Sequence, residues 1–148
     1  MPNLKFVAGS ADMRDMFEWK NEYAVNIGSI DAQHQMLFAI GRELHEAMSA
    51  GKGRHVLSKI LDRLVEYTMR HFTHEESLLR LHKYPNFAGH KAEHDALARK
   101  VVEFQAEFNS GKIAMALEVL NFVQNWLQCH IQGSDFAYAA CLKGKKVA

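Results

Sequence analysis

The amino-acid sequence predicts an all-α protein, an antiparallel up-down-up-down four-helix bundle with an N-terminal extended arm. Turn-forming residues divide the chain at four places, 26–29, 49–53, 84–86 and 109–112. Between these places, apolar residues recur every three or four positions, which is the spacing of one face of an α-helix. Because the links between the long segments are short, consecutive helices are expected to run in opposite directions.

The first two segments each carry such an apolar face, and polar residues interrupt it. The face of the first segment comprises Ile30, His34, Leu37, Phe38, Gly41, Leu44 and Met48. The face of the second comprises Leu57, Ile60, Leu61, Leu64, Thr68, His71, Phe72, Glu75 and Leu78. We therefore expect one histidine of the first helix, and a histidine and a glutamate of the second, to point into the core.

The last two segments repeat this arrangement. The face of the third comprises Phe87, His90, His94, Leu97, Val101, Phe104 and Phe108. The face of the fourth comprises Ile113, Ala116, Leu120, Val123, Leu127 and His130. Because His90 and His94 are four residues apart, they are expected to project from one face of the helix on successive turns.

The bundle domain is expected to span residues 16–137. Residues 1–15 form an N-terminal extension outside it, and residues 138–148, which end in the lysine-rich "LKGKKVA", are expected to form a flexible tail. Three aromatic residues before the first helix are expected to cover part of the bundle: Phe17, Trp19 and Tyr23.

Composition narrows the class of protein. The 148 residues suffice for one domain with a sizeable core, and the formal net charge is +1 without a basic cluster, which argues against nucleic acid or an anionic membrane as partner. No apolar run approaches the roughly 18 residues of a membrane-spanning helix. The two cysteines, Cys129 and Cys141, form no CxxC pair, and the N-terminal residues do not look like a signal peptide, so a cytoplasmic location is expected.

The polar residues of the four inner faces are expected to meet at one end of the bundle: His34, His71, Glu75, His90, His94 and His130. They lie near the start of the first and third helices and near the end of the second and fourth, which coincide in an antiparallel bundle. Burying them without partners would be costly, and imidazole with carboxylate suits iron, manganese or zinc. Five imidazoles are too many for one tetrahedral zinc with an exchangeable position, so two metals sharing a carboxylate fit better.

Three further residues remain open from spacing alone. Asp135 follows His130 by five residues, about 140° away around an ideal helix, so it joins the cluster only if the last turn bends, bulges or ends, which Gly133 makes plausible. His74 is the rival of His71 on the second helix, although it lies off the leucine face. Glu76 is expected to be solvated.

Several of these motifs resemble the hemerythrin family, in its bacterial branch: "HFTHE" (71–75), "HKAEH" (90–94) and "HIQGSD" (130–135), together with His34. The resemblance extends over about residues 16–135 and includes "FEW" (17–19) and "YPNF" (84–87). It implies a four-helix bundle with a non-haem di-iron centre, in which an oxo or hydroxo group bridges the irons and O2 binds reversibly.

The resemblance also implies a role for each candidate ligand. One iron would be held by His90, His94 and His130. The other would be held by His34 and His71, which leaves one position open. Glu75 and Asp135 would bridge the two irons.

Apolar side chains beside the ligands are expected to line an O2 pocket: Phe72, Trp126, Leu127 and Ile131. The expected function is that of an O2 carrier, store or sensor and not an enzyme, with NO or azide as further small ligands and an open oligomeric state. Two alternatives remain: a di-iron enzyme that reduces O2 or peroxide or oxidises a substrate, and a metal-storage or structural bundle. No glutamate stands three residues before a histidine, unlike the Glu-x-x-His motifs of carboxylate-rich di-iron proteins, which favours binding over oxidation.

Overall fold

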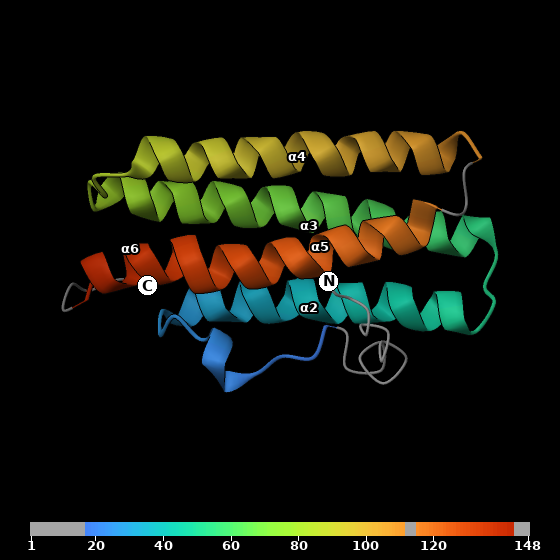
Figure 1. Ribbon diagram of the computed structural model, residues 1–148, viewed down its shortest axis with the longest axis horizontal. Helices are drawn as coiled ribbons and strands as arrows, with labels where there is room; N and C mark the ends of the chain where they lie inside the picture. Colours follow the sequence, from blue (N-terminus) through green and yellow to red (C-terminus); the bar gives the residue numbers. More distant parts are fainter. Residues whose placement is uncertain (1–16, 112–114, 144–148) are drawn as a thin grey trace, which may run out of the picture.

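Four long helices form the body of the protein in a computed structural model that describes residues 17–111 and 115–143. They are α2 (Gly28–Ser49), α3 (Arg54–Leu81), α4 (Phe87–Asn109) and α5 (Met115–His130). Consecutive helices run in opposite directions along the long axis of the molecule (Figure 1). The prediction of an all-α, up-down-up-down bundle is confirmed.

Short elements flank the bundle. A 3-10 turn, η1 (Asn21–Tyr23), precedes α2, and α5 continues through a π-helical turn, η2 (Ile131–Asp135), into α6 (Phe136–Cys141). Residues 112–114, which include the expected core residue Ile113, lie outside the described part of the chain, as do 1–16 and 144–148. Within the described residues, no helix combines the length and apolar character that crossing a membrane requires.

Backbone hydrogen bonds close two of the links between helices. After α2, Lys52 N–H donates to Ala47 O and Gly51 N–H to Met48 O, with Gly51 at a φ of +70°. This is a Schellman ending, in which a left-handed residue satisfies the last free carbonyls of the helix. The same pattern ends α3, where Lys83 takes the left-handed position with a φ of +54°. Tight endings of this kind turn the chain back at once, which makes neighbouring helices antiparallel.

The segment before α2 covers one side of the bundle, as the sequence predicts. Phe17 and Tyr23 are buried, and Trp19 is partly buried against them. The backbone N–H of Phe17 donates to Gln124 Oε1 at 2.8 Å, and Arg42 donates to Phe17 O at 2.8 Å. Phe17 is therefore hydrogen-bonded to both α2 and α5. Its φ of +64° lies in the left-handed region, which residues other than glycine rarely adopt.

The prediction of a flexible tail from residue 138 onward is wrong for the described residues 138–143. Residues 136–141 form α6, and both Tyr138 and Leu142 are buried. The apolar and aromatic residues of "FAYAACL" (136–142) have enough surface to pack on the bundle, and the lysine-rich stretch begins only at Lys143.

Candidate metal centre

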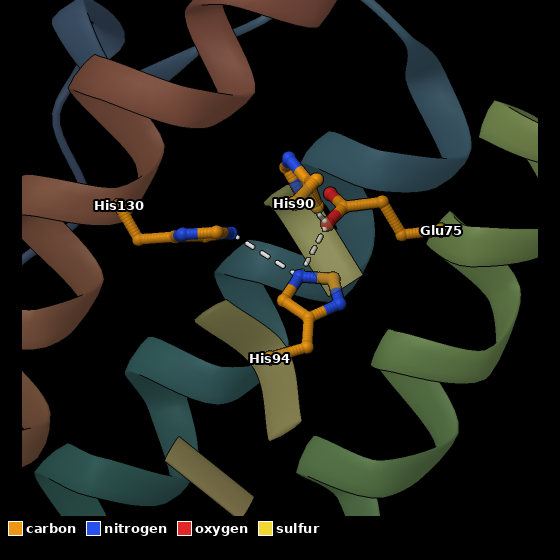
Figure 2. A group of neighbouring side chains, drawn as sticks. All are labelled: Glu75, His90, His94 and His130. Carbon is orange, nitrogen blue, oxygen red and sulfur yellow. Dashed lines mark hydrogen bonds and ion pairs between the residues drawn. The ribbon is translucent and has the colours of Figure 1, made fainter. Parts of the chain in front are cut away.

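Seven polar side chains are buried together at one end of the bundle. Their exposed fractions are at most 5%: His34, His71, Glu75, His90, His94, His130 and Asp135. They come from all four long helices and from η2. Figure 2 shows four of them, with the imidazoles of His94 and His130 pointing toward each other beside Glu75. The structure thus brings together every residue that the sequence analysis proposed as a ligand.

Asp135 reaches this cluster because the helix widens. Residues Ile131–Asp135 form a π-helical turn, in which backbone hydrogen bonds span five residues instead of four. Positions 130 and 135 consequently come onto the same face. The φ of Gly133 is not positive, so the π-helical turn has a backbone conformation that residues other than glycine can also adopt.

Potential ligand atoms form two groups that share Glu75. The three-histidine group consists of His90, His94 and His130 with Glu75, and the two-histidine group consists of His34 and His71 with Glu75. Within each group the atoms lie within 4.8 Å of one another. Such compact sets of imidazole and carboxylate suit a divalent transition metal.

The two oxygens of Glu75 face different groups. Oε1 lies 2.9 Å from Nε2 of both His90 and His94. Oε2 lies 3.6 Å from His71 Nε2 and 3.9 Å from His34 Nε2. A carboxylate placed in this way can contribute one oxygen to each of two metal ions.

Asp135 divides its oxygens in the same way. Oδ1 lies 3.1 Å from His130 Nε2 and 3.2 Å from His90 Nε2, whereas Oδ2 lies 3.2 Å from His34 Nε2. Neither oxygen takes part in a hydrogen bond with a described residue, although the side chain is fully buried. The negative charge of a buried carboxylate is costly unless it is compensated, and cations bound between its oxygens and these imidazole nitrogens would compensate it.

Two facing nitrogens support the same interpretation. His94 Nε2 and His130 Nε2 are 3.2 Å apart. Each of these rings bonds a carboxylate through Nδ1, which must donate, so in the neutral rings both Nε2 atoms present lone pairs. Two lone pairs at this distance repel each other unless a proton or a cation lies between them. The residues present therefore fit a metal site.

The carboxylates also set the charge of the imidazoles around them. Burial disfavours the charged form of His90, but Asp135 and Glu75 raise its pKa to about 9. Burial lowers the pKa of His71 to about 3, because its attraction to Glu75 is too weak to compensate. Burial likewise disfavours the ionised form of Asp135, yet the imidazoles of His130, His34 and His90 hold its pKa well below the usual value.

Three residues outside the cluster orient its imidazoles. His71 Nδ1 donates to Gln33 Oε1 at 2.7 Å, His94 Nδ1 to Glu76 Oε2 at 2.9 Å, and His130 Nδ1 to Glu93 Oε1 at 2.8 Å. Donation from Nδ1 leaves the Nε2 lone pair directed into the cluster, which is the form that binds a metal.

Sequence reasoning missed these three partners. The expectation that Glu76 is solvated is wrong, since its side chain is 15% exposed and bonded to His94. The usable signal is adjacency: Gln33, Glu76 and Glu93 each stand directly beside a cluster residue in the sequence. Consecutive helical residues point about 100° apart, so the neighbour of an inward residue faces the next helix.

Tyr138 is a further contact that the sequence analysis did not find. Its hydroxyl donates to Glu75 Oε2 at 2.6 Å, and its ring packs against His90 at 5.3 Å between centroids. The assignment of residue 138 to a tail concealed it. The hydrogen bond fixes the shared carboxylate from the side of α6.

The structure separates His71 from its rival His74. His71 is 2% exposed and faces the cluster, whereas His74 is half-buried and forms a hydrogen bond with Ser29 Oγ at 3.0 Å, away from the cluster. The geometry therefore favours His71 as the candidate ligand of α3.

Apolar side chains enclose the imidazoles. The Phe72 ring stacks on His94 at 3.8 Å, and Trp126 stacks on His130 at 4.2 Å. Leu127 on α5 and Ile131 in η2 are also buried, and they directly follow Trp126 and His130 in the sequence. Phe72 also contacts His71, so it touches both groups, while the ring contacts of Trp126 within the cluster are with His94 and His130 of the three-histidine group.

Comparison with known proteins identifies relatives that contain the same kind of domain. A family model described as the hemerythrin HHE cation binding domain matches residues 25–142. The bacteriohemerythrin of Methylococcus capsulatus is 36% identical over 82% of this chain and 92% of its own length. The bacteriohemerythrin of Clostridium acetobutylicum is 34% identical over 83% of this chain and 98% of its own.

More distant and structural relatives agree. Myohemerythrin-1 of Phascolopsis gouldii is 27% identical, covering 90% of this chain and 98% of its own. A crystal structure of a wild-type hemerythrin superimposes with a TM-score of 0.77 at 35% identity, covering 85% of this chain and 97% of the other. The matched residues 25–142 include all seven residues of the buried histidine and carboxylate cluster and α6. The chain belongs to the hemerythrin family.

Proposed function

We propose that this protein binds O2 reversibly at a pair of non-haem iron ions held by the buried cluster. The observation that carries the proposal is that Glu75 and Asp135 both divide their oxygens between the same two histidine groups. Two shared carboxylates would hold one cation at each histidine group, and the family's oxo or hydroxo group would complete such a pair.

The unequal number of histidines supports an open coordination position. One iron would be held by the three imidazoles of His90, His94 and His130 together with one oxygen of each shared carboxylate. The two-histidine group offers one imidazole fewer, so the iron beside His34 and His71 would keep a position for a small ligand. The same position would accept NO or azide.

The protein's own residues control access to this position. The bound iron pair would supply the electrons for O2 binding, and the surrounding side chains would decide whether O2 leaves unchanged. The rings and apolar side chains of Phe72, Leu127 and Ile131 exclude water from the imidazoles, which limits the proton supply that would release reduced oxygen. Tyr138 and the Nδ1 partners keep the ligands in place.

The ligand chemistry favours binding over oxidation of a substrate. Five neutral imidazoles donate less negative charge than a carboxylate-rich set, so highly oxidised iron is stabilised less. We therefore propose a carrier, store or sensor of O2 in the cytoplasm and not an enzyme.

Reversible spectroscopy tests this function. The iron-loaded protein is reduced without air, exposed to O2 and then flushed with argon through several cycles, while iron content and visible absorption are recorded. We expect two irons per chain and an absorption band that appears with O2 and disappears without it. Irreversible oxidation with release of peroxide would instead indicate an enzyme, and a colourless protein with bound zinc a structural bundle.

A further inference from the structure

The partners of the imidazole Nδ1 atoms differ in charge. Glu76 and Glu93, both carboxylates, accept from His94 and His130 at 2.9 and 2.8 Å. Gln33, a neutral amide, accepts from His71 at 2.7 Å. The three hydrogen bonds have similar lengths, so they orient the rings equally well and differ mainly in the charge behind each ring.

The remaining imidazole of the two-histidine group extends this contrast. His34 is 1% exposed, and its Nδ1 has no hydrogen-bond partner among the described residues. Both carboxylate partners therefore lie behind the three-histidine group. In the two-histidine group, a neutral amide accepts from Nδ1 of one ring, and no described residue accepts from Nδ1 of the other.

A carboxylate behind a ligating histidine has a known physical effect. A hydrogen bond to an ionised acceptor is roughly twice as strong as a neutral one, and it pulls the Nδ1 proton away from the ring. The imidazole then becomes a more basic ligand at Nε2, and removing such a partner typically costs about 10- to 100-fold in metal affinity.

We propose that Gln33, Glu76 and Glu93 are positioning residues that make the two metal positions unequal, so that the three-histidine position fills first and the two-histidine position stays weaker and poorer in donated charge. The inference rests on the two-metal site of the proposed function, but not on O2 binding. Its consequence for O2 is direct. Less charge donated through His71 leaves the open iron harder to oxidise permanently, which favours release of O2.

Charge-exchange variants separate this role from simple orientation. Glu76→Gln keeps an oxygen that can accept from His94 but removes the charge. Gln33→Glu does the reverse behind His71. Glu93→Gln is a second test of the three-histidine side, although Glu93 Oε1 also accepts from Ser134 of η2 at 2.7 Å, so Glu76 is the cleaner position. The exposed residues Glu103 and Gln35 provide matched controls, Glu103→Gln on α4 and Gln35→Glu on α2.

Titration with Co²⁺ under argon measures the two positions without O2. The metal-free full chain is expected to bind two equivalents in two resolved steps, followed by the cobalt absorption bands and by calorimetry. Glu76→Gln should weaken the first step by about 10-fold or more and leave the second nearly unchanged. Gln33→Glu should strengthen the second step by a similar factor, while both controls behave like the parent.

Several outcomes would overturn the inference. Binding of a single equivalent would remove the two positions, and equal shifts of both steps would remove the asymmetry. If Glu76→Gln matched the parent while Glu76→Ala lost affinity, the residue would only orient His94. Circular dichroism checks that each variant is folded. Two unequal cobalt steps in a protein without reversible O2 binding would uphold this inference and contradict the proposed function.

The iron-loaded Gln33→Glu variant gives an independent readout. More charge donated through His71 should lower the reduction potential of the iron pair and shorten the time before the O2-exposed protein becomes permanently oxidised. An unchanged potential in this variant, alongside a normal iron content, would contradict the charge argument.

Discussion

Adjacent residues of one helix can have different roles at the site, one inside the cluster and the next as the Nδ1 acceptor of an imidazole on another helix. Glu75 points into the cluster, and Glu76, next in sequence, bonds His94 from the side. The rotation of about 100° between consecutive residues is enough to change a side chain from buried cluster residue to partner of the neighbouring helix. Substitutions at adjacent positions should therefore have different effects, even where the residue types are the same.

His71 and His74 test this distinction on α3. His71→Ala removes an imidazole of the two-histidine group, so the purified protein should lose about one of two irons. His74→Ala removes a hydrogen bond with Ser29 outside the cluster and should retain both. Iron analysis by mass spectrometry decides between them, and the reverse pattern would make His74 the ligand.

Leu127 tests the apolar enclosure. We expect Leu127 to line the O2 pocket without being a ligand, so in Leu127→Ala iron should stay bound while the O2-exposed protein oxidises several-fold faster. Leu120→Ala, at a fully buried residue of the same helix about two turns away, is the matched control. Both substitutions should lower the free energy of unfolding by about 2–5 kcal/mol. Equal oxidation rates in the two variants would show that Leu127 does not line the pocket.

Among the secondary-structure elements, the π-helical turn after α5 brings Asp135 into the cluster. Spacing alone indicated that Asp135 could join His130 only through a bend, a bulge or a helix end, and η2 is the bulge. The sequence could not choose among the three, because the choice depends on what α6 packs against. Tyr138 of α6 and Leu142, directly after it, are buried against the bundle, whereas the composition of residues 138–148 as a whole concealed this short apolar stretch.

Gly41 is where the N-terminal segment meets α2. A Cβ atom at this position would overlap the Phe17 ring, and Phe17 is fully buried and bonded through both its backbone N–H and its carbonyl. Gly41→Ala should therefore destabilise the protein by about 1–3 kcal/mol, despite the better helix propensity of alanine.

Gly28→Ala on the same helix is the control for this prediction, because no atom lies within 4 Å of its added Cβ. Thermal unfolding of the two variants gives the comparison. A Gly41→Ala protein as stable as the parent would show that the packing of Phe17 on α2 contributes little.

For the whole molecule, the cluster makes both metal affinity and the stability of the fold depend on pH.

Periodicity predicted which side chains enter the core, since an inward histidine occupies a position where the helical pattern would otherwise place a leucine. Periodicity did not identify the Nδ1 partners of these histidines, because adjacency to a cluster residue marks Gln33 and Glu93 only as candidates and the position of the neighbouring helix decides which imidazole they reach. A metal bound by residues of every long helix would stabilise the entire bundle.

The raised pKa of His90 makes metal uptake pH-dependent. In metal-free protein His90 is protonated below its pKa of about 9, and a metal must displace that proton. Affinity should rise with pH up to about 9, and binding at pH 7 should release about one proton or more, measured by calorimetry in buffers of different ionisation enthalpy. Uptake without proton release would show that His90 is neutral or does not bind.

The free energy of unfolding of the metal-free protein should fall as the pH rises, whereas metal affinity should rise. Because the folded-state pKa of His90 lies above the ordinary value of 6.5, its contribution is fully present below pH 6.5 and is lost as the pH rises through about 9. Urea denaturation of the chelator-treated protein between pH 6 and 10 measures this, and a flat profile would contradict the assignment.

The order of the outer partners along the chain bears on how the protein folds. Gln33 on α2 bonds a ring on α3, Glu76 on α3 bonds a ring on α4, and Glu93 on α4 bonds a ring on α5. Each helix thus carries the acceptor for the helix that is synthesised after it, so every successive hairpin can orient its own imidazole through local contacts. The ring of His34 stands on α2, the first long helix among the described residues, so no earlier long helix among them supplies an acceptor.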